Sequence, residues 1–405
     1  MRLLVVGTGG VGAAVAEVAR RRDFLDRVTL ADLDPERPRR IVAALDDGRF
    51  EAATLDASDT ASVAALIGES GSDAVLNATD PRFNPPIFAA AFEAGAAYVD
   101  MAMTLSEPHP ERPYEEPGVL LGDAQLAEHE RWRERGLLAL VGMGVEPGLS
   151  DVFARYAADH LFAEIDEVAV RDGSDIVVEG YGFAPIFSIW TTIEECLNPP
   201  LVWERDRGFY TTEPFSESEL FEFPDGIGVI ECVNVEHEEV VLVPRGVDCR
   251  RVTFKYGLGA EFIGVLKTLH KLGLDSTRPV RVRGAEVAPR DVVAAALPDP
   301  ATLGDRMRGR TCAGTLVTGT GADGVPKAAY LHHVADNERT MREYGHQAVV
   351  LQTALNPVVA LELLDRGTWK GTGVLGPEAF DAVPFLELLA AYGEPYAVVD
   401  GDPRR

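Results

Sequence analysis

The sequence is poor in cysteine and in long apolar runs, and both shortages exclude classes of protein. The cysteines are scattered and form no CxxC pair, which argues against a zinc site and against a disulfide framework. They are Cys196, Cys232, Cys249 and Cys312. We therefore expect buried, reduced thiols and no bound metal. No apolar stretch approaches the roughly 18 residues that a membrane helix needs, and no leader precedes the first strand. We expect a cytoplasmic protein without membrane contact.

Positive charge is also scarce. The 405 residues carry a formal net charge of −27 at pH 7, which would repel the phosphates of nucleic acids and of anionic membranes. The chain has five lysines and none before Lys255, so a common catalytic base is missing from the first 254 residues. At 46% hydrophobic residues the chain can bury large cores, and its length favours two domains. We expect a globular protein that binds a small molecule and no nucleic acid.

Residues 1–148 alternate between short apolar runs and helical patterns. Strand character is present in RLLVVG, RVTLAD, FEAATLDA, DAVLNAT, AAYVDMA and LLALVGM, with helical spacing between them. This alternation predicts an α/β fold, a doubly wound parallel sheet of the Rossmann type with helices on both faces.

The pattern changes after residue 148. Residues 149–335 hold strand-like segments without regular helices between them, among them EVAVRDG, GVIECVNVE, EVVLVP and RRVTFKYG. A hairpin is expected with Asp323 and Gly324 at its turn. These features predict a second, α+β domain with a mixed, largely antiparallel sheet. Residues 336–405 have a helical pattern, in which Pro357 is expected to kink or break the helix.

The stretch VVGTGGVG carries the spacing GxGxxG between the first strand and the first helix. Gly7 suits the tight turn, Gly9 lets a pyrophosphate approach the backbone, and Gly12 lets helix and strand pack closely. We predict a nicotinamide dinucleotide on this loop. The predicted contacts are Gly7, Thr8, Gly9, Gly10, Val11 and Gly12.

Asp32 ends the second strand, where a carboxylate accepts both ribose hydroxyls of NAD and repels a 2′-phosphate. NAD is therefore favoured, and capping of the following helix is the alternative role for Asp32. Arginines close behind keep NADP open as the less favoured cofactor. They are Arg37, Arg39 and Arg40. Asp56 ends the third strand and is expected either to meet the adenine or to cap a helix.

The fourth predicted strand ends where the chain usually passes the nicotinamide ribose. Its last residues, Asn77, Ala78 and Thr79, are therefore added to the predicted cofactor contacts.

In combination, these motifs resemble the saccharopine dehydrogenase superfamily, especially its lysine 6-dehydrogenase and saccharopine reductase branches. The resemblance spans nearly the whole chain and rests on several blocks. They are VVGTGGVG, VTLADLD, RFNPPIFAAAFEAGAAYVD, GVEPGLSD, FSIWTTIEECLNPP, VEHEEVVLVPRG and GVLGPEAF. It implies a C-terminal helix that returns to the Rossmann domain, and a homodimer.

The resemblance also implies an oxidoreductase that acts on the CH–NH group of an amino acid or related amine. Oxidative deamination of the lysine 6-dehydrogenase type is the first interpretation. An NADP-dependent reductase of the saccharopine or carboxynorspermidine type, which joins an aldehyde and an amine, is the second. A dinucleotide-binding sensor without turnover is the alternative of another class. The residues 101–104 depart from the lysine enzymes, so lysine itself is in question as the substrate.

Such a reaction needs groups that move protons, and we select candidates by position. Asp100 ends the fifth strand and either contacts the substrate or caps the next turn. Glu146, on the turn fixed by GVEPG, is expected to face a cationic amine or the nicotinamide amide, and Asp151 to cap the next helix. His237 is a candidate proton shuttle, with a solvent-facing strand position as the alternative.

Further residues are candidates for binding the substrate. Arg171 and Arg245 are possible partners of a substrate carboxylate, unless they are ordinary surface arginines. Tyr181 and Phe187 are candidates for the pocket wall, with core packing as the alternative. The remaining pair, His332 and His333, is interpreted as structural.

Overall fold

The computed structural model describes residues 1–405, and its first layer is a seven-stranded parallel sheet in the order β19-β6-β5-β4-β1-β2-β3. The strands are β1 (Arg2–Val6), β2 (Arg27–Asp32), β3 (Phe50–Thr54), β4 (Ala74–Asn77), β5 (Ala97–Asp100), β6 (Leu138–Leu140) and β19 (Gly373–Leu375). The helices between them are α1 (Gly10–Arg20), α2 (Glu36–Leu45), α3 (Thr60–Ser70), α4 (Asn84–Ala94), α5 (Asp123–Leu126) and α6 (His129–Glu134). The doubly wound Rossmann prediction is confirmed.

The central strands are apolar without alternation because helices cover both faces of the sheet. In β1 the last four residues, 3–6, are at most 1% exposed. The strand order reverses between β1 and β4, so the loops after these strands diverge and leave a crevice at the carboxyl edge of the sheet. The glycine-rich loop follows β1 directly and therefore lies at this crevice.

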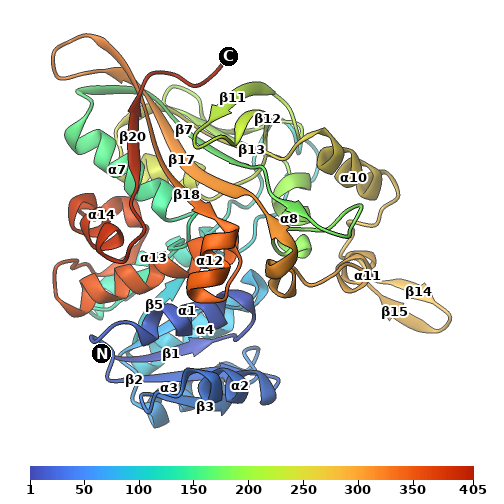
Figure 1. Ribbon diagram of the computed structural model, residues 1–405, viewed down its shortest axis with the longest axis vertical. Helices are drawn as coiled ribbons and strands as arrows, with labels where there is room; N and C mark the ends of the chain where they lie inside the picture. Colours follow the sequence, from blue (N-terminus) through green and yellow to red (C-terminus); the bar gives the residue numbers. More distant parts are fainter.

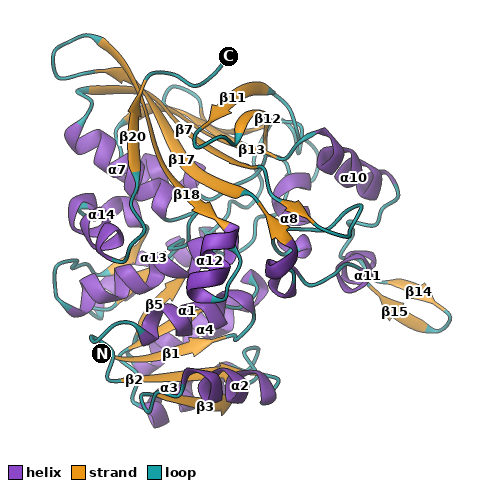
Figure 2. Cartoon of the chain, viewed as in Figure 1, coloured by secondary structure: helices purple, strands orange, loops and turns teal.

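A second sheet of nine strands lies across the first domain (Figure 1). Its main path runs β10-β9-β13-β7-β17-β18-β20, and Figure 2 shows the long strands in orange. The strands are β7 (Glu164–Ser174), β9 (Leu201–Glu204), β10 (Gly208–Thr211), β11 (Glu219–Phe223), β12 (Gly228–Asn234), β13 (Cys249–Gly257), β17 (Arg310–Thr320), β18 (Pro326–Asp336) and β20 (Ala397–Asp400). Only β13 and β7 pair in parallel, which confirms a mixed, largely antiparallel sheet.

Shorter elements surround this sheet. The helices are α7 (Leu149–His160), α8 (Ile189–Leu197), α9 (Glu239–Gly246), α10 (Ala260–Lys271), α11 (Pro289–Ala296), α12 (Asn337–Tyr344), α13 (Ala348–Asp365) and α14 (Ala382–Ala391). Two short strand pairs, β8 (Val177–Val178) with β16 (Met307–Arg308) and β14 (Val280–Val282) with β15 (Ala285–Val287), lie outside the main sheets. The second pair extends away from the body of the molecule (Figure 1).

Two local expectations need correction. The segment EVVLVP is not a strand but most of α9, whose buried residues 239–243 pack onto β13. The late helical pattern breaks at Gly345, which ends α12 with φ +74°, whereas α13 continues through Pro357. Left-handed backbone at a helix end suits glycine, so the break has a local cause that outweighs the proline.

The C-terminal segment ties both domains together. Beyond its helices it contributes β19 to the edge of the Rossmann sheet and β20 to the edge of the second sheet. Helix α13 packs against α1, and α7 packs against β17. The expectation that no apolar stretch approaches membrane-helix length was wrong: by length and composition α13 would suffice to cross a membrane, although 83% of it is buried inside the protein. Its apolar character is explained by this packing.

Candidate functional site

The glycine-rich loop between β1 and α1 excludes side chains at two motif positions. Gly7 has φ +93°, and a Cβ on Gly12 would lie 2.0 Å from the carbonyl oxygen of Gly7. A Cβ on Gly9 would meet nothing within 4 Å, so this position opens onto free space. The loop therefore packs tightly on the side of the strand and leaves room at the start of α1, where free amide groups attract an anion. This geometry fits a dinucleotide pyrophosphate.

Asp32 lies beside this loop at the end of β2. The Oδ2 atom of Asp32 accepts hydrogen bonds from the backbone N–H and the hydroxyl of Thr8, at 2.8 and 2.9 Å. Burial alone would raise the pKa of Asp32, but these donors and the N–H of Asp34 lower it. The carboxylate is therefore ionised and fixed at the position where the adenosine ribose of a dinucleotide lies in Rossmann domains.

The turn after β4 also faces the crevice. The buried amide of Asn77 donates to Asn84 and to the hydroxyl of Tyr98, at 2.7 and 3.2 Å, and its oxygen accepts from the N–H and hydroxyl of Thr79. Asn77, Ala78 and Thr79 all line the cavity described next. Asn77 thus shapes the turn that Ala78 and Thr79 continue.

Asp56 does not cap a helix, which corrects one of its two expected roles. Its carboxylate is exposed and accepts hydrogen bonds from the N–H and hydroxyl of Ser58, at 2.9 and 2.6 Å. The cap of α3 is Asp59, which accepts from the N–H of Ala61. By sequence, Asp56 and Asp59 are both suitable caps. Because α3 begins at Thr60, Asp59 is the residue in the cap position.

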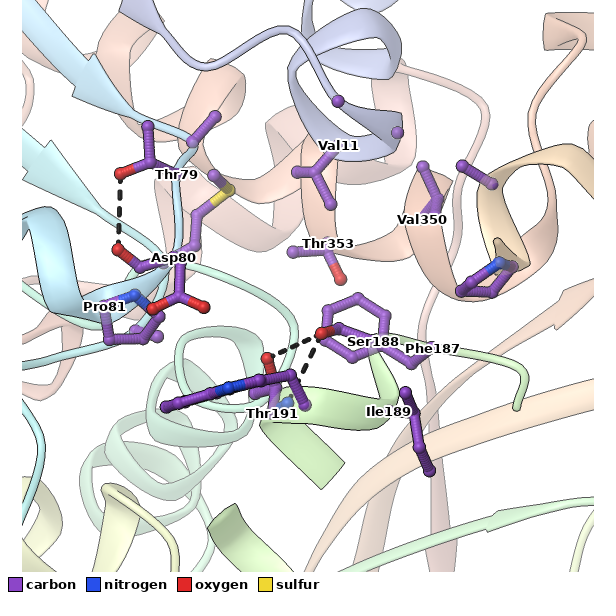
Figure 3. A pocket seen from close by; sticks show the side chains of 18 of the residues that line it. Val11, Thr79, Asp80, Pro81, Phe187, Ser188, Ile189, Thr191, Val350 and Thr353 are labelled. Atoms are coloured by element: carbon purple, nitrogen blue, oxygen red, sulfur yellow. Dashed lines mark hydrogen bonds between the residues drawn. The ribbon is translucent and has the colours of Figure 1, made fainter. Parts of the chain in front are cut away.

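A cavity of about 560 Å³ opens between the glycine-rich loop and the second domain. Figure 3 shows that Val11, from the start of α1, and Thr79 face Ser188 and Thr191 across this space. A second cavity of about 360 Å³ continues over β7 and β13. The two cavities share Glu146, Phe187, Glu195 and Thr353. We call them together the cleft, the first being its glycine-loop end and the second its acidic end.

The cleft is lined by carboxylic acids and by no basic side chain. Its acids are Asp80, Glu146, Asp172, Glu195, Glu238, Glu261 and Asp299, and no lysine, arginine or histidine is among the lining residues. Aromatic side chains supply much of the remaining wall of the acidic end. They are Tyr181, Phe183, Phe187, Tyr256 and Phe262. Several carboxylic acids between apolar walls, with no basic side chain among them, concentrate negative potential. The acidic end therefore favours ligands that carry positive charge.

The turn of GVEPGLSD places Glu146 where the two cavities meet. A Cβ on Gly148, whose φ is +132°, would lie 2.1 Å from the carbonyl oxygen of Gly144, so this turn requires glycine. The N–H of Gly314 donates to Glu146 at 3.2 Å. Burial first and the nearby Asp172 next raise the pKa of Glu146 well above its usual range. Asp172 has its own pKa raised to about 6, mainly by burial. The pair therefore holds a proton until a cation enters.

Asp151 acts at the start of α7, although not as the N-cap residue itself. It is the third residue of the helix and accepts a hydrogen bond at 2.8 Å from the N–H of Gly148, which is the N-cap. The side chain is fully buried, and burial raises its pKa well above the usual range. Asp151 therefore stabilises the turn that carries Glu146.

His237 is in a loop between β12 and α9 and only 1% exposed, so it is not a solvent-facing strand residue. Its ring stacks on Phe254 with the centroids 3.8 Å apart. The Nδ1 atom lies 2.5 Å from Glu239 Oε2, and the Nε2 atom lies 3.0 Å from the hydroxyl of Tyr256. Tyr256 lines the acidic end of the cleft, so His237 reaches the cleft through this tyrosine.

His237, Glu238 and Glu239 each place a possible ligand atom within 4.8 Å of the others. Both ring nitrogens of His237 already have hydrogen-bond partners, so these side chains form a network along which protons can move. The absence of a bound metal stays a prediction.

Asp100 is buried at the end of β5 and does not line the cleft. Its two carboxylate oxygens accept hydrogen bonds from the N–H of Gly142 and from the amide of Gln125, both at 2.7 Å. Burial raises the pKa of Asp100 to about 7. Asp100 thus ties the ends of β5 and β6 together. This role is close to its expected alternative, the capping of the next turn.

The two candidate arginines lie outside the cleft. Arg171 is 1% exposed and pairs with Glu219, and Arg245 is exposed near the end of α9. Successive residues of a strand point to opposite faces, so Arg171 faces away from the cleft while Asp172 faces into it. Tyr181 and Phe187 do line the cleft.

The two late histidines lie in the core, in keeping with a structural role. His332 stacks on Tyr330, and His333 contacts Glu394 and Gln352 at 3.2 and 3.0 Å. Sequence reasoning missed Asp172, Glu195 and Tyr256. The acidic pair in TIEEC was a usable signal for Glu195, because neighbouring helical residues face different directions and one of two acids is often free. Here Glu194 pairs with Arg290, and Glu195 faces the cleft.

Fold and site together define an NAD(P)-dependent oxidoreductase. The chain belongs to the saccharopine dehydrogenase family: residues 3–140 match its "Saccharopine dehydrogenase NADP binding domain" and residues 144–394 its "Saccharopine dehydrogenase C-terminal domain". A carboxynorspermidine synthase from Vibrio cholerae is 30% identical over 414 residues, covering 100% of this chain and 98% of the relative. A carboxyaminopropylagmatine dehydrogenase from Synechocystis is 28% identical, covering 99% of this chain and 98% of the relative.

A solved structure shares the fold of the whole chain. It is the apo saccharopine dehydrogenase (L-Glu forming) from Saccharomyces cerevisiae, with a TM-score of 0.71, 14% identity and 99% coverage of both chains. The predicted resemblance to this family is therefore confirmed.

Proposed function

We propose that the protein is a reductase that joins a carboxyl-bearing aldehyde to one end of a diamine or longer polyamine. The product is a secondary amine, and the reverse reaction cleaves it oxidatively. This is the second interpretation of the sequence, and it replaces deamination of the lysine 6-dehydrogenase type as the leading one. The names of both relatives, carboxynorspermidine synthase and carboxyaminopropylagmatine dehydrogenase, describe carboxylated polyamines and support the proposal.

The observation that carries the proposal is the charge of the cleft. At the acidic end of the cleft, the α-carboxylate of a substrate such as lysine would meet acids and would lack its usual partner, an arginine fork. The lining residues include no arginine, and Arg171 and Arg245 lie elsewhere. A diamine instead brings two positive charges joined by methylene groups. Carboxylates at Glu146, Asp172 and Glu261 between aromatic walls match that pattern.

The residues of the glycine-loop end fit a nicotinamide dinucleotide. Gly9 leaves space at the start of α1, Thr8 and Asp32 flank the ribose position, and Ala78 and Thr79 continue toward the middle of the cleft. When bound, the nicotinamide supplies the hydride for reduction of a C=N bond. The start of α8 also lines this end, with its Ser188 and Thr191 hydroxyls. These neutral donors and the positive end of the helix dipole suit the carboxylate of the aldehyde.

We propose NAD(H) as the cofactor, on the strength of the ionised Asp32. The description of the family's first domain names NADP, so the test is direct. Asp32→Asn removes the charge that repels a 2′-phosphate and weakens NADH binding, with an expected change of about tenfold in the NADH to NADPH preference. Fluorescence titration with both reduced cofactors measures this ratio. A wild-type protein that binds NADPH at least tenfold more tightly than NADH contradicts the cofactor assignment.

The function itself is tested by a panel of paired substrates. A four-carbon amino-acid aldehyde is combined with diamines of three to five methylene groups, with agmatine and with a monoamine, and NADH or NADPH consumption is followed by absorbance. Mass spectrometry then identifies the secondary amine. Turnover with diamines and at least tenfold less with the monoamine is expected. Reduction of NAD by lysine alone supports the lysine 6-dehydrogenase reaction instead, and cofactor binding without any turnover supports a sensor.

A further inference from the structure

A continuous hydrogen-bonded chain runs from a buried histidine to the junction of the two cavities. Glu239 Oε2 lies 2.5 Å from His237 Nδ1, His237 Nε2 lies 3.0 Å from the Tyr256 hydroxyl, and that hydroxyl donates to Glu195 Oε2 at 3.2 Å. Ser150 donates to the other oxygen of Glu239 at 2.7 Å. The inner end of the chain is sealed, because His237 and Glu239 are 1% and 0% exposed. The outer end is Glu195, which lines both cavities.

The proposed reaction needs such a device because it consumes a proton. An aldehyde and an ammonium ion give a secondary ammonium ion and water only when one hydride and one further proton are added. The ammonium ion supplies the proton with which the carbinolamine loses its hydroxyl as water, and the further proton is needed after hydride transfer, when the neutral secondary amine becomes an ammonium ion. A cleft filled by cofactor and two substrates excludes the bulk water that would otherwise supply it.

We propose that Glu195 is the general acid and base of the cleft and that Tyr256, His237 and Glu239 form an internal proton store that recharges it. This inference rests on the proposed function for its substrates. The Glu195 carboxylate takes a proton from the ammonium ion and returns it to the carbinolamine oxygen, the C–O bond breaks, and water leaves behind a C=N bond with positive charge on nitrogen. After the hydride adds to carbon, Tyr256 gives its proton to Glu195 while His237 Nε2–H gives one to the tyrosine oxygen, and Glu195 passes its proton to the neutral secondary amine. The store refills from water when the cleft opens.

The stored proton rests on His237 and leaves it through Glu195 only when a base of similar strength, the neutral secondary amine with a pKa of about 10, takes it up. Burial raises the pKa of Glu195 to about 7, which lets it hold and release a proton near neutral pH. Burial also raises the pKa of Tyr256 well above its usual range, so a phenolate does not persist and the two transfers are coupled. Burial alone would lower the pKa of His237, but Glu239, Glu238 and Glu195 raise it to about 10. The imidazole is therefore a charged donor at neutral pH.

Every neighbour of this chain is acidic or neutral. Besides Glu239, the imidazole faces Glu238, whose Oε2 lies 3.4 Å from Nδ1, and Phe254 stacks on its ring. Asp172 and Glu146 face Tyr256 from β7 and from the GVEPG turn. None of these neighbours is a cation that would repel the charged imidazole, so the surrounding carboxylates keep the ring protonated.

The first experiment separates the relay from substrate binding. Glu195→Ala is expected to lower kcat at least 100-fold while the NADH dissociation constant changes less than threefold, and added acetate restores at least a tenth of the lost rate. Tyr256→Phe is expected to lower kcat tenfold or more with the diamine KM within threefold. Tyr210→Phe is the matched control, because its hydroxyl also bonds a glutamate, Glu204, at 2.8 Å and lies outside the cleft. Its kcat stays within twofold of wild type.

The second experiment does not depend on the substrate. Carbon-13 NMR of labelled histidine rings, assigned with His237→Gln, is expected to show the His237 ring still protonated at pH 8.5. A neutral His237 ring at pH 8.5, or kcat within threefold of wild type in both Glu195→Ala and Tyr256→Phe, overturns the proton store. Wild-type protein that is inactive with every aldehyde and amine pair overturns the proposed function, and the NMR result still decides whether the stored proton exists.

Discussion

The two ends of the cleft are built in opposite ways. The glycine-loop end is made largely of backbone from neighbouring residues, and its critical atoms lie within one turn, from Gly7 to Gly12. The acidic end collects side chains from segments far apart in the chain, such as Glu146, Asp172 and Glu261. In the proposed function, the first end binds a cofactor whose pyrophosphate is common to NAD and NADP, whereas the second fits one particular substrate. The shape of the glycine-loop end is set by residues adjacent in the chain, whereas the charge of the acidic end depends on segments that the fold brings together.

The carboxylates of the two ends also differ in protonation. Asp32 is surrounded by N–H and O–H donors, which lower its pKa despite partial burial. Glu195 is also partly buried but accepts from few donors, the Tyr256 hydroxyl among them, and its pKa rises to about 7. The same functional group is thus kept ionised to meet ribose hydroxyls and kept near its titration point to exchange protons. Donor supply, more than burial alone, separates the two roles.

The sharpest way to break the glycine-loop end is to fill the contact between helix and strand. Gly12→Val is expected to abolish cofactor binding and to lower the free energy of unfolding by several kcal/mol, because a Cβ at this position would lie 2.0 Å from the carbonyl oxygen of Gly7. Calorimetry with and without NADH measures both effects. Gly12→Val protein that binds NADH normally contradicts the close-packing account.

Two further glycines calibrate that result. Gly9→Ala is expected to retain the fold and weaken NADH binding more than tenfold, because the added methyl group enters space left for the pyrophosphate. Gly68→Ala, inside α3 with open space around it, is expected to stabilise the protein by about 0.5–1 kcal/mol. A Gly9→Ala protein that has lost its fold contradicts the distinction between Gly9, which leaves space for the ligand, and Gly12, which allows close packing.

The protonation contrast predicts opposite pH dependences of stability. The pKa of Glu195 is raised from 4.5 to about 7, so its contribution is present below pH 4.5 and is lost as pH rises to about 7, by about 3 kcal/mol. The pKa of Asp32 is lowered, so its contribution is present above pH 4 and is lost as pH falls further. Urea unfolding of Glu195→Gln and Asp32→Asn from about pH 2 to pH 8 measures both slopes. Equal slopes in the two variants and wild type contradict the contrast.

The smallest expected effect sharpens the role of charge at the acidic end. Glu146→Gln is expected to raise the KM for a diamine about tenfold and to leave NADH binding unchanged, because a neutral amide replaces a group that ionises when the cation binds. The wild-type KM for the diamine is also expected to fall as pH rises from 6 to 8, since the bound cation displaces protons. The exposed Glu69→Gln on α3 is the control. A Glu146→Gln protein with the wild-type KM for the diamine shows that the charge of Glu146 does not decide substrate binding.

Local patterns predicted the Rossmann sheet, the hairpin turn and the glycine-rich loop because each depends on neighbouring residues. They failed where two neighbours compete for one role. Asp56 and Asp59 compete for the cap of α3, and Arg171 and Asp172 point to opposite faces of β7. Such pairs are resolved by the register of a helix or strand against the rest of the fold, and a single sequence does not contain that register.

His237 shows the same limit from another side. A solvent-facing strand position was one of its two expected roles, but the segment EVVLVP that follows it folds as α9, which packs against β13. The histidine is thereby buried beside Phe254 and Tyr256. Its burial comes from contacts such as Phe254, 17 residues away along the chain, whereas the carboxylates that keep it charged include the adjacent Glu238 and Glu239.

The sequence by itself determined a loop shaped for a dinucleotide at the start of the first helix, because tight turns and close packing depend on glycines only a few bonds apart. It also determined the excess of negative charge. The tertiary structure alone decided which acids line the cleft, which arginines leave it and how His237 reaches it through Tyr256. The physical reason is that burial and electrostatic neighbours are properties of the folded chain, since they depend on segments that meet only when the two sheets close over the crevice.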